Sequence, residues 1–388
     1  MLSITAYSLA NALGTGRNAC LRALQGGVSG LAPLNMSGVE LRCHAGLVSG
    51  LDEQALPSHL RQFDCRNNRL AERVLLADDF VSAVENARHR YGSSRIGVFL
   101  GTSTSGIACT EEAYAAAEDV KALPPFNFQG THSLGALSEY VAERLGLTGP
   151  TATVSTACSS SAKVFGMARR YVDAGFCDAA VVGGVDTLCL TTLYGFNALE
   201  LVSEQPARPW GRHRDGISIG EGGGLALLEP AVGGDTVLFL GYGESSDAHH
   251  MSTPHPQGVG ALQAIDSAIT SAGVDRLEYV NLHGTGTPSN DGAEDQAVVQ
   301  AFGRDTWCSS TKGATGHTLG GAGITEALFC CIAIEEGMVP GGVTEPTLDP
   351  ALNARFATRS FRHPVRRAAS LSLGFGGSNC CLIFGRGA

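Results

Sequence analysis

The sequence is poor in charged residues, and this scarcity narrows the class of protein. Only 16% of the 388 residues are charged, whereas 44% are hydrophobic. An average soluble domain has about 25% charged residues, so we expect much of this chain to lie in a core or a subunit interface. The net charge of −10 argues against a nucleic-acid partner and against binding to an anionic membrane surface.

The sequence also lacks a long apolar run, a basic leader followed by apolar residues, and any CxxC pair. The long uncharged stretch around 146–162 is rich in Gly, Ser and Thr, so we expect no membrane span and no secretory signal. The twelve scattered cysteines do not have the spacing of a zinc site or a redox dithiol. We therefore expect a reduced, cytoplasmic protein without a metal.

Helical periodicity alternates with short apolar runs along the whole chain. The predicted helices span 69–90, 110–122, 133–145, 159–174, 259–272 and 321–336. The predicted strands span 95–101, 179–184, 225–228, 237–241, 279–282, 371–373 and 381–384. Uniformly apolar strands separated by helices indicate an α/β fold whose sheets are covered on both faces.

A Pro- and Gly-containing stretch at 229–235 lies between two predicted strands and is the best candidate for a domain boundary. It predicts an N-terminal half of residues 1–233 and a C-terminal half of residues 234–388. No internal repeat is evident in the sequence itself.

Cys158 is the first candidate for chemistry. It follows the small residues Thr153–Ala157 and precedes a predicted amphipathic helix. A cysteine at a helix N-terminus faces unpaired N–H groups and the positive end of the helix dipole, so we expect a lowered thiol pKa. An inert buried cysteine is the commoner alternative. This segment alone does not distinguish the two.

Two histidines in Gly-rich turns strengthen the case for an active site. His283 follows an apolar strand in Tyr279–Pro288, and His317 precedes a predicted helix in Lys312–Gly323. Active groups in α/β proteins commonly lie at such strand ends. Two imidazoles could assist loss of a donor carboxylate and stabilise the resulting enolate oxygen.

These segments together resemble those of the β-ketoacyl-[acyl carrier protein] synthases, condensing enzymes of the thiolase fold. The resemblance covers most of the chain. It is carried by the ordered segments Gly101–Gly106, Thr153–Ser161, Arg214–Gly222, Asp247–Pro256, Tyr279–Pro288, Lys312–Gly323 and Ser372–Asn379. It implies a five-layered α-β-α-β-α fold with two similar halves, the nucleophile in the first half and both histidines in the second.

The resemblance also implies a role for each matching residue. Cys158 is expected to hold the acyl chain as a thioester, while His283 and His317 promote decarboxylation of a malonyl group. Lys312 and Glu326 match a supporting charge pair. The remaining implied roles are binding of the phosphopantetheine arm by Thr285 and Thr287, gating by Phe375, and an oxyanion hole formed by the N–H groups of Cys158 and Phe375.

The implied reaction is decarboxylative Claisen condensation in fatty acid, polyketide or polyene biosynthesis. We expect no cofactor of the chain's own, because the phosphopantetheine arm arrives on the acyl carrier protein. The implied partners are that carrier and either a second copy of the chain or a related subunit resembling a chain-length factor. Residues after Ile107, including Phe126–Gly135, are expected to reach this neighbour.

The sequence departs from the family pattern at three places, and two competing functions fit it less well. Trp210-Gly211 stands where relatives usually have Phe-Asp, and Ser161 replaces a common glycine. Gly101–Gly106 contains Thr-Ser-Thr-Ser, which is less glycine-rich than in housekeeping relatives and suggests a specialised pathway. A non-catalytic chain-length subunit usually lacks the cysteine and one or both histidines, which this sequence keeps. A degradative thiolase would have a second cysteine in a C-terminal Cys-x-Gly loop, whereas Cys380 and Cys381 fall in a predicted strand.

Overall fold

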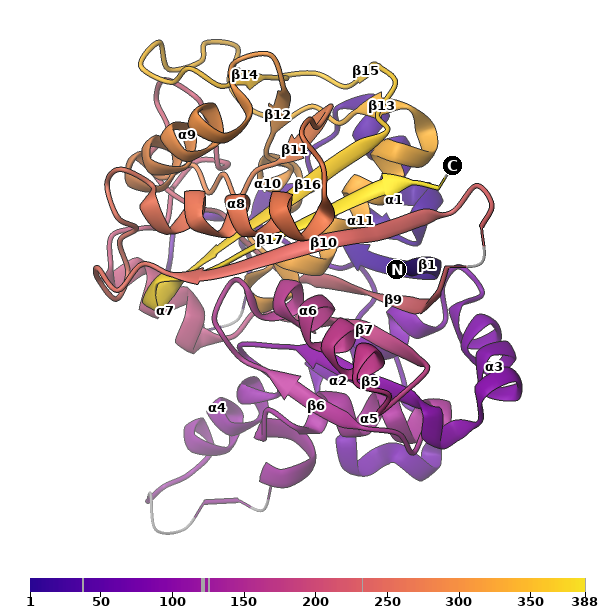
Figure 1. The fold of residues 1–388 in the computed structure, drawn as a ribbon. Coiled ribbons are helices and arrows are strands. Elements are labelled where there is room, and N and C mark those ends of the chain that lie inside the picture. Colours follow the sequence, from indigo (N-terminus) through magenta and orange to yellow (C-terminus); the bar gives the residue numbers. More distant parts are fainter. Residues whose placement is uncertain (37, 120–122, 125, 232, 388) are drawn as a thin grey trace.

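The computed structural model describes all residues except 37, 120–122, 125, 232 and 388, and one large mixed sheet forms its frame (Figure 1). Its strand order is β14-β12-β11-β16-β17-β10-β1-β9-β7-β5-β6. The bounds are β1 (Leu2–Asn11), β5 (Ile96–Gly101), β6 (Thr151–Val154), β7 (Ala179–Asp186), β9 (Gly222–Pro230), β10 (Val237–Ser246), β11 (Tyr279–Asn281), β12 (Trp307–Ser309), β14 (Arg355–Phe356), β16 (Arg367–Gly374) and β17 (Ser378–Arg386).

The two sides of this sheet repeat one topology. From the centre outward, β1-β9-β7-β5-β6 and β10-β17-β16-β11-β12 follow the same chain order and have the same sequence of strand directions. The first two pairings on each side are antiparallel and the next two are parallel. β1 and β10 connect the sides through only three residue pairs. The similarity of the halves is therefore visible in strand topology, although it is not evident in the sequence.

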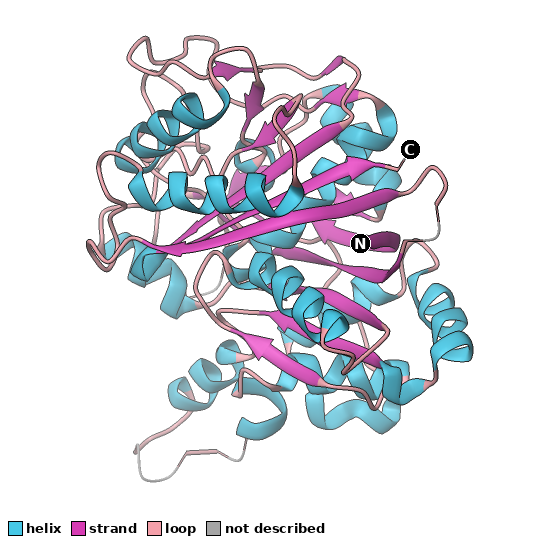
Figure 2. Cartoon of the chain, viewed as in Figure 1, coloured by secondary structure: helices cyan, strands magenta, loops and turns pink. Residues whose placement is uncertain are grey.

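Helices form three layers around the two halves of the sheet (Figures 1 and 2). On one outer face, α8 (Val259–Ala272) packs on β10 and β17, and α9 (Pro288–Phe302) packs beside it. On the other, α2 (Arg66–Leu75), α3 (Phe80–Tyr91) and α5 (Ala136–Leu145) cover the first half.

Between them, α6 (Ser160–Asp173) and α11 (Ala322–Glu336) contact each other and strands of both halves. Residues 322–334 of α11 are all buried, as expected for a helix that is apolar on every side. The predicted five-layered α-β-α-β-α thiolase fold is confirmed.

Shorter elements complete the fold. The remaining helices are α1 (Arg17–Gly26), α4 (Ile107–Ala115), α7 (Leu190–Ala198) and α10 (Lys312–Thr315), with single turns at 58–63, 93–95, 128–132, 319–321 and 375–377. A small sheet contains β3 (Leu31–Pro33), β4 (His44–Gly46) and β8 (Ile219–Gly220), and a second pairs β13 (Met338–Val339) with β15 (Phe361–Arg362). β2 (Gly14–Thr15) pairs with β1. No helix in the described part of the chain is long and apolar enough to cross a bilayer.

Two helix predictions differ from the structure. The predicted helix 69–90 is wrong as a single element, because α2 ends at Leu75 and α3 begins at Phe80. Asp78 and Asp79 between them have φ values of 53° and 56°, which no α-helix accommodates. The predicted helix 110–122 begins earlier and ends at Ala115, and its last residues, 120–122, lie outside the described residues. The domain division at 233/234 remains a prediction.

Candidate active site

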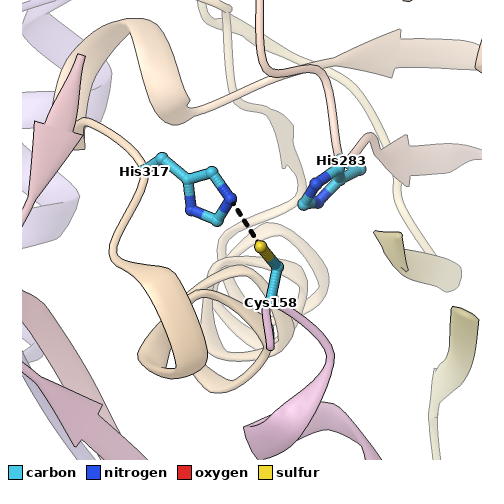
Figure 3. Close-up of side chains that lie close together, drawn as sticks. All are labelled: Cys158, His283 and His317. Atoms are coloured by element: carbon cyan, nitrogen blue, oxygen red, sulfur yellow. Dashed lines mark hydrogen bonds between the residues drawn. The ribbon is translucent and has the colours of Figure 1, made fainter. Parts of the chain in front are cut away.

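Cys158, His283 and His317 meet in one buried site, although they lie far apart in the sequence (Figure 3). The Nε2 atom of His317 is 3.0 Å from the Sγ atom of Cys158. The two imidazole rings are nearly perpendicular, with their centroids 5.2 Å apart. Cys158 comes from the first half of the chain and both histidines from the second, as the resemblance implies.

A strained turn presents Cys158 to the histidines. β6 ends at Val154, and α6 begins at Ser160 after the cap residue Ser159. Ala157 has a φ of 51°, a left-handed conformation that costs a non-glycine residue roughly 1–2 kcal/mol. The turn therefore places the thiol just before the helix N-terminus instead of within its first turn.

Burial has the largest effect on the pKa of the Cys158 thiol. It raises the pKa of the Cys158 thiol to about 11, against the opposing effects of the nearby Lys312 charge and a hydrogen bond from the backbone N–H of Phe375. The prediction of a lowered pKa is wrong for the resting thiol, because the sequence shows the helix terminus but not the desolvation. Formation of the thiolate therefore depends on His317, Lys312 and the Phe375 amide.

His317 is fixed through both its backbone and its ring. Its backbone N–H donates to the carbonyl of Ser218, and its carbonyl accepts from the N–H of Gly220. The Nδ1 atom accepts a hydrogen bond from the backbone N–H of Leu319 at 3.1 Å. A neutral imidazole that accepts at Nδ1 carries its proton on Nε2, so that atom donates to the Cys158 sulfur.

His283 has the same tautomer for a different reason. Its Nδ1 atom lies 3.3 Å from the Nζ atom of Lys312, which can only donate. Its proton is therefore on Nε2. Burial, the charge of Lys312 and the proximity of His317 lower the pKa of His283 well below its usual value, and burial and Lys312 do the same for His317. Both imidazoles are thus neutral Nε2–H donors near neutral pH.

Lys312 is balanced by one carboxylate. It begins α10 and forms a fully buried ion pair with Glu326 of α11. Burial raises the pKa of Glu326 to about 7, although the charge of Lys312 acts in the opposite direction. The predicted pairing of these residues is therefore present, and it brings a cation next to His283 in the centre of the molecule.

The other predicted site residues lie around one pocket that also contains Cys158 and both histidines. Thr285 and Thr287 line it, with their hydroxyl oxygens 3.0 Å apart. Phe375 also lines it and packs against Phe196 of α7, with ring centroids 5.4 Å apart. The structure thus brings all eight predicted residues into or directly behind one pocket. Their individual roles remain predictions.

Sequence reasoning missed three buried carboxylates that support the site. Asp186, at the end of β7, accepts hydrogen bonds from the backbone N–H groups of Ser103, Thr104 and Gly320. A lone Asp ending an apolar strand, in Val185-Asp186-Thr187, was the available signal. This carboxylate ties the Gly101–Gly106 segment to the turn after His317.

The other two buried carboxylates are Glu294 and Glu221, which lie in different halves of the chain. Glu294 of α9 accepts from the backbone N–H groups of His283 and Gly284, at 2.6 and 2.7 Å. Burial raises the pKa of Glu294 to about 8. The fully buried side chain of Glu221 accepts from Arg66 and from the backbone N–H of Val48. Both residues lie near Gly-rich segments, but nothing in the sequence shows that their side chains are buried.

A metal would fit the spacing of the three central residues but not their charge environment. The possible ligand atoms of Cys158, His283 and His317 all lie within 4.8 Å of one another. The ammonium group of Lys312 already occupies the Nδ1 atom of His283 and would repel a dication. Condensation through a thioester requires no such ion, and the absence of a metal remains a prediction.

Comparisons with known proteins identify the family. Residues 3–232 match the family described as beta-ketoacyl synthase, N-terminal domain, and residues 237–344 match beta-ketoacyl synthase, C-terminal domain. The 3-oxoacyl-[acyl-carrier-protein] synthase 2 of Vibrio cholerae is 31% identical over 372 residues, covering 88% of each chain. The mitochondrial 3-oxoacyl-[acyl-carrier-protein] synthase of Arabidopsis thaliana is 35% identical over 315 residues, covering 75% of this chain and 68% of the relative.

Solved structures extend the likeness over nearly the whole chain. The ketosynthase ApeO, in complex with its chain length factor ApeC from Xenorhabdus doucetiae, is similar with a TM-score of 0.91 and 36% identity, covering 99% of this chain and 98% of the other. The ishigamide ketosynthase/chain length factor has a TM-score of 0.88 and 26% identity, with the same coverage. The chain therefore belongs to the β-ketoacyl synthase family of condensing acyltransferases.

Proposed function

We propose that this chain condenses a malonyl group carried by an acyl carrier protein with an acyl chain held as a thioester on Cys158. The observation that carries the proposal is that two neutral Nε2–H imidazoles lie beside one buried thiol, with His317 in contact with its sulfur. A non-catalytic chain-length subunit has no use for this arrangement. Cys380 and Cys381 are buried within β17, which gives no support to a thiolase reaction.

The first half-reaction is acyl transfer. The Cys158 sulfur attacks the carbonyl carbon of the incoming thioester, and the carrier thiol leaves with the proton. The developing oxyanion is stabilised by the backbone N–H groups of Cys158 and Phe375. The Phe375 amide, which hydrogen-bonds the resting sulfur, is already aimed at this position. Thr285 and Thr287 bind the phosphopantetheine arm along the pocket.

The second half-reaction forms the new carbon–carbon bond. The Nε2–H groups of His283 and His317 bind the thioester carbonyl oxygen of the malonyl group, so its carboxyl group leaves while the electrons remain as an enolate. The enolate carbon attacks the acyl carbonyl, and the Cys158 thiolate departs. Lys312 keeps His283 in the donating tautomer and is itself balanced by Glu326.

The pathway and partner follow from the solved relatives. Two of the similar structures are ketosynthases solved with chain length factors, and one of them is 36% identical to this chain. They support a specialised polyketide or polyene pathway and a heterodimeric partner of the same fold. The twelve cysteines are all unpaired, which supports a reducing, cytoplasmic compartment.

The first test is acyl labelling followed by mass spectrometry. Incubation with an acyl carrier thioester should add one acyl group to Cys158, and Cys158→Ala should abolish both labelling and condensation. Cys109→Ala is the matched control, because Cys109 is a partly exposed cysteine outside the pocket. Acyl label on another cysteine, with Cys158 unmodified, would contradict the proposal.

A second test separates the half-reactions. His283→Ala or His317→Ala should slow malonyl decarboxylation by about 100-fold or more, because each removes a donor to the enolate oxygen. Acyl transfer to Cys158 should fall much less, since the enolate does not exist in that step. Carbon dioxide release and acyl labelling are measured separately. Equal losses in both steps would indicate general collapse of the site instead.

A further inference from the structure

The backbone of His317 extends the small sheet that contains β3, β4 and β8. β4 pairs with β8, and Ile219 of β8 forms a bridge with His317 on its other side. The His317 N–H donates to the Ser218 carbonyl at 2.7 Å, and the Gly220 N–H donates to the His317 carbonyl at 2.9 Å. The position of the imidazole is therefore set by segment 218–220.

An ion pair anchors this segment immediately after Gly220. The side chain of Glu221 is fully buried, and its two oxygens accept from the Nε and Nη2 atoms of Arg66 at 3.0 and 2.7 Å. One oxygen also accepts from the Val48 N–H at 2.9 Å, and the Glu221 N–H donates to the Gly46 carbonyl. Such a two-point contact fixes orientation as well as distance.

There is no free space between the anchored segment and the His317 turn. A Cβ atom placed on Gly46 or Gly220 would lie 2.2 or 2.4 Å from the carbonyl oxygen of Thr315. Backbone therefore packs directly on backbone, two residues before His317. Because close-packed interiors transmit small displacements, movement of Glu221 must shift the His317 turn.

We propose that Arg66 and Glu221 are a positioning pair that holds the Nε2–H of His317 against the Cys158 sulfur. Neither residue lines the pocket, so both act through the backbone of residues 218–220. The consequence for condensation rests on the proposed function. The consequence for the thiol does not, because any displacement of His317 removes a hydrogen bond from Cys158.

The test is the pH profile of Cys158 alkylation by iodoacetamide, followed on the Cys158 peptide by mass spectrometry. Glu221→Gln places an amide NH2 group against the donors of Arg66 or Val48, so the segment must move. Loss of the Nε2–H donor should raise the apparent pKa of the Cys158 thiol by about one unit, the size expected for one hydrogen bond to a thiolate. Alkylation at a fixed pH below that pKa should slow about tenfold.

Glu72→Gln is the matched control. Glu72 is also buried and accepts two contacts from one arginine, Arg144. Its partners Arg144 and Tyr140 both lie in α5, and neither lines the pocket. Glu72→Gln should lose thermal stability without any change in the alkylation profile. An unchanged profile in folded Glu221→Gln would overturn the proposal, because a merely structural ion pair would behave as Glu72 does.

Arg66→Lys provides a second variant should Glu221→Gln fold poorly. Lysine keeps the charge but lacks the planar fork, so a smaller shift in the same direction is expected. In the condensation assay, Glu221→Gln should lower kcat about tenfold while KM for the malonyl carrier changes less than twofold. If wild type fails to accept an acyl group, the proposed function fails, whereas the alkylation profile still decides whether the pair positions His317.

Discussion

Lys312 contributes both to the stability of the protein and to the chemistry of the site. A fully buried ammonium group is costly, yet its Nζ atom contacts both Glu326 and the Nδ1 atom of His283. The first contact offsets the cost of burying the charge, and the second sets the tautomer that donates from Nε2. The two contributions can be separated by changing the lysine alone or together with Glu326.

Lys312→Met should destabilise the protein by about 3–5 kcal/mol, because it leaves the Glu326 carboxylate buried without a partner. Lys312→Met/Glu326→Leu removes both charges and should recover most of that loss. Neither variant should recover condensation activity, because His283 loses the donor that fixes its tautomer. Denaturant unfolding and a condensation assay check the two halves of this prediction. Recovery of activity in the double variant would show that the pair is only structural.

The raised pKa of Glu294 predicts how the stability of the protein depends on pH. Its folded-state pKa of about 8 lies above the usual value for a glutamate, so its contribution to stability is complete below that usual value and is lost as the pH rises through about 8. Glu294→Gln cannot titrate. Relative to wild type, its free energy of unfolding should improve by at least about 1 kcal/mol between pH 5 and pH 9. Urea unfolding at several pH values measures this difference, and a constant difference would contradict the assignment.

The residues that could be predicted were those whose chemical type is rare in its local context. Cys158, His283 and His317 each stand in a segment of small residues, which made them candidates, and the family resemblance then gave their roles. The sequence marks Asp186 only as a lone Asp at the end of an apolar strand. Its hydrogen-bond partners were not predictable, because they come from residues 103–104 and 320, which only the fold brings together. The direction of the Cys158 pKa shift failed for the same reason, since burial is a property of the assembled site.

At the scale of elements, the turn between β6 and α6 is strained at Ala157 and holds the nucleophile Cys158. Ala157→Gly should keep acyl transfer to Cys158 and leave stability equal or higher by up to about 1 kcal/mol, because glycine adopts the positive φ without steric cost. Ala157→Val should lose at least about 2 kcal/mol and most acyl transfer, since a β-branched residue strongly disfavours this conformation. Thermal unfolding and acyl labelling measure both effects. Full labelling of Ala157→Val would show that the turn tolerates other geometries.

Helices with an uninterrupted apolar pattern were predictable from the sequence. A helix end that is set by backbone conformation was not. The predicted helix 259–272 is α8, and 321–336 is α11 to within one residue. In 69–90 the apolar period continues from Leu70 through Val84, so the pattern cannot reveal the two left-handed aspartates that separate α2 from α3. β1 and β6 were missed, because Thr, Ser and Tyr interrupt their apolar residues.

At the scale of the whole molecule, the repeated topology explains where the site lies. Cys158 precedes α6, and His317 lies just before α11, the two helices that pack together in the central layer. These helices follow β6 and β12, which hold equivalent places in the two halves. The nucleophile and its hydrogen-bond donor thus approach each other across the approximate symmetry of the fold. His283 follows β11, the neighbour of β12, and completes the site from one side only.

At the same scale, exposed apolar residues after Ile107 predict how the protein assembles. Tyr114, Phe128 and Leu134 are each more than 40% exposed, and α4, which contains Tyr114, contacts the turn 128–132. Exposed large apolar side chains of this kind are typical of an interface. We expect the chain to form a dimer through this region, with itself or with a related cysteine-less subunit. Phe128→Asp should weaken the dimer at least about 30-fold, the loss expected from removing a central aromatic contact.

Native mass spectrometry with and without co-expressed relatives measures the strength of the dimer. Leu76→Asp, which changes an exposed leucine between α2 and α3, is the control. A fully active monomer at assay concentration would contradict the prediction, whereas activity only with a second, cysteine-less chain would identify a heterodimeric synthase.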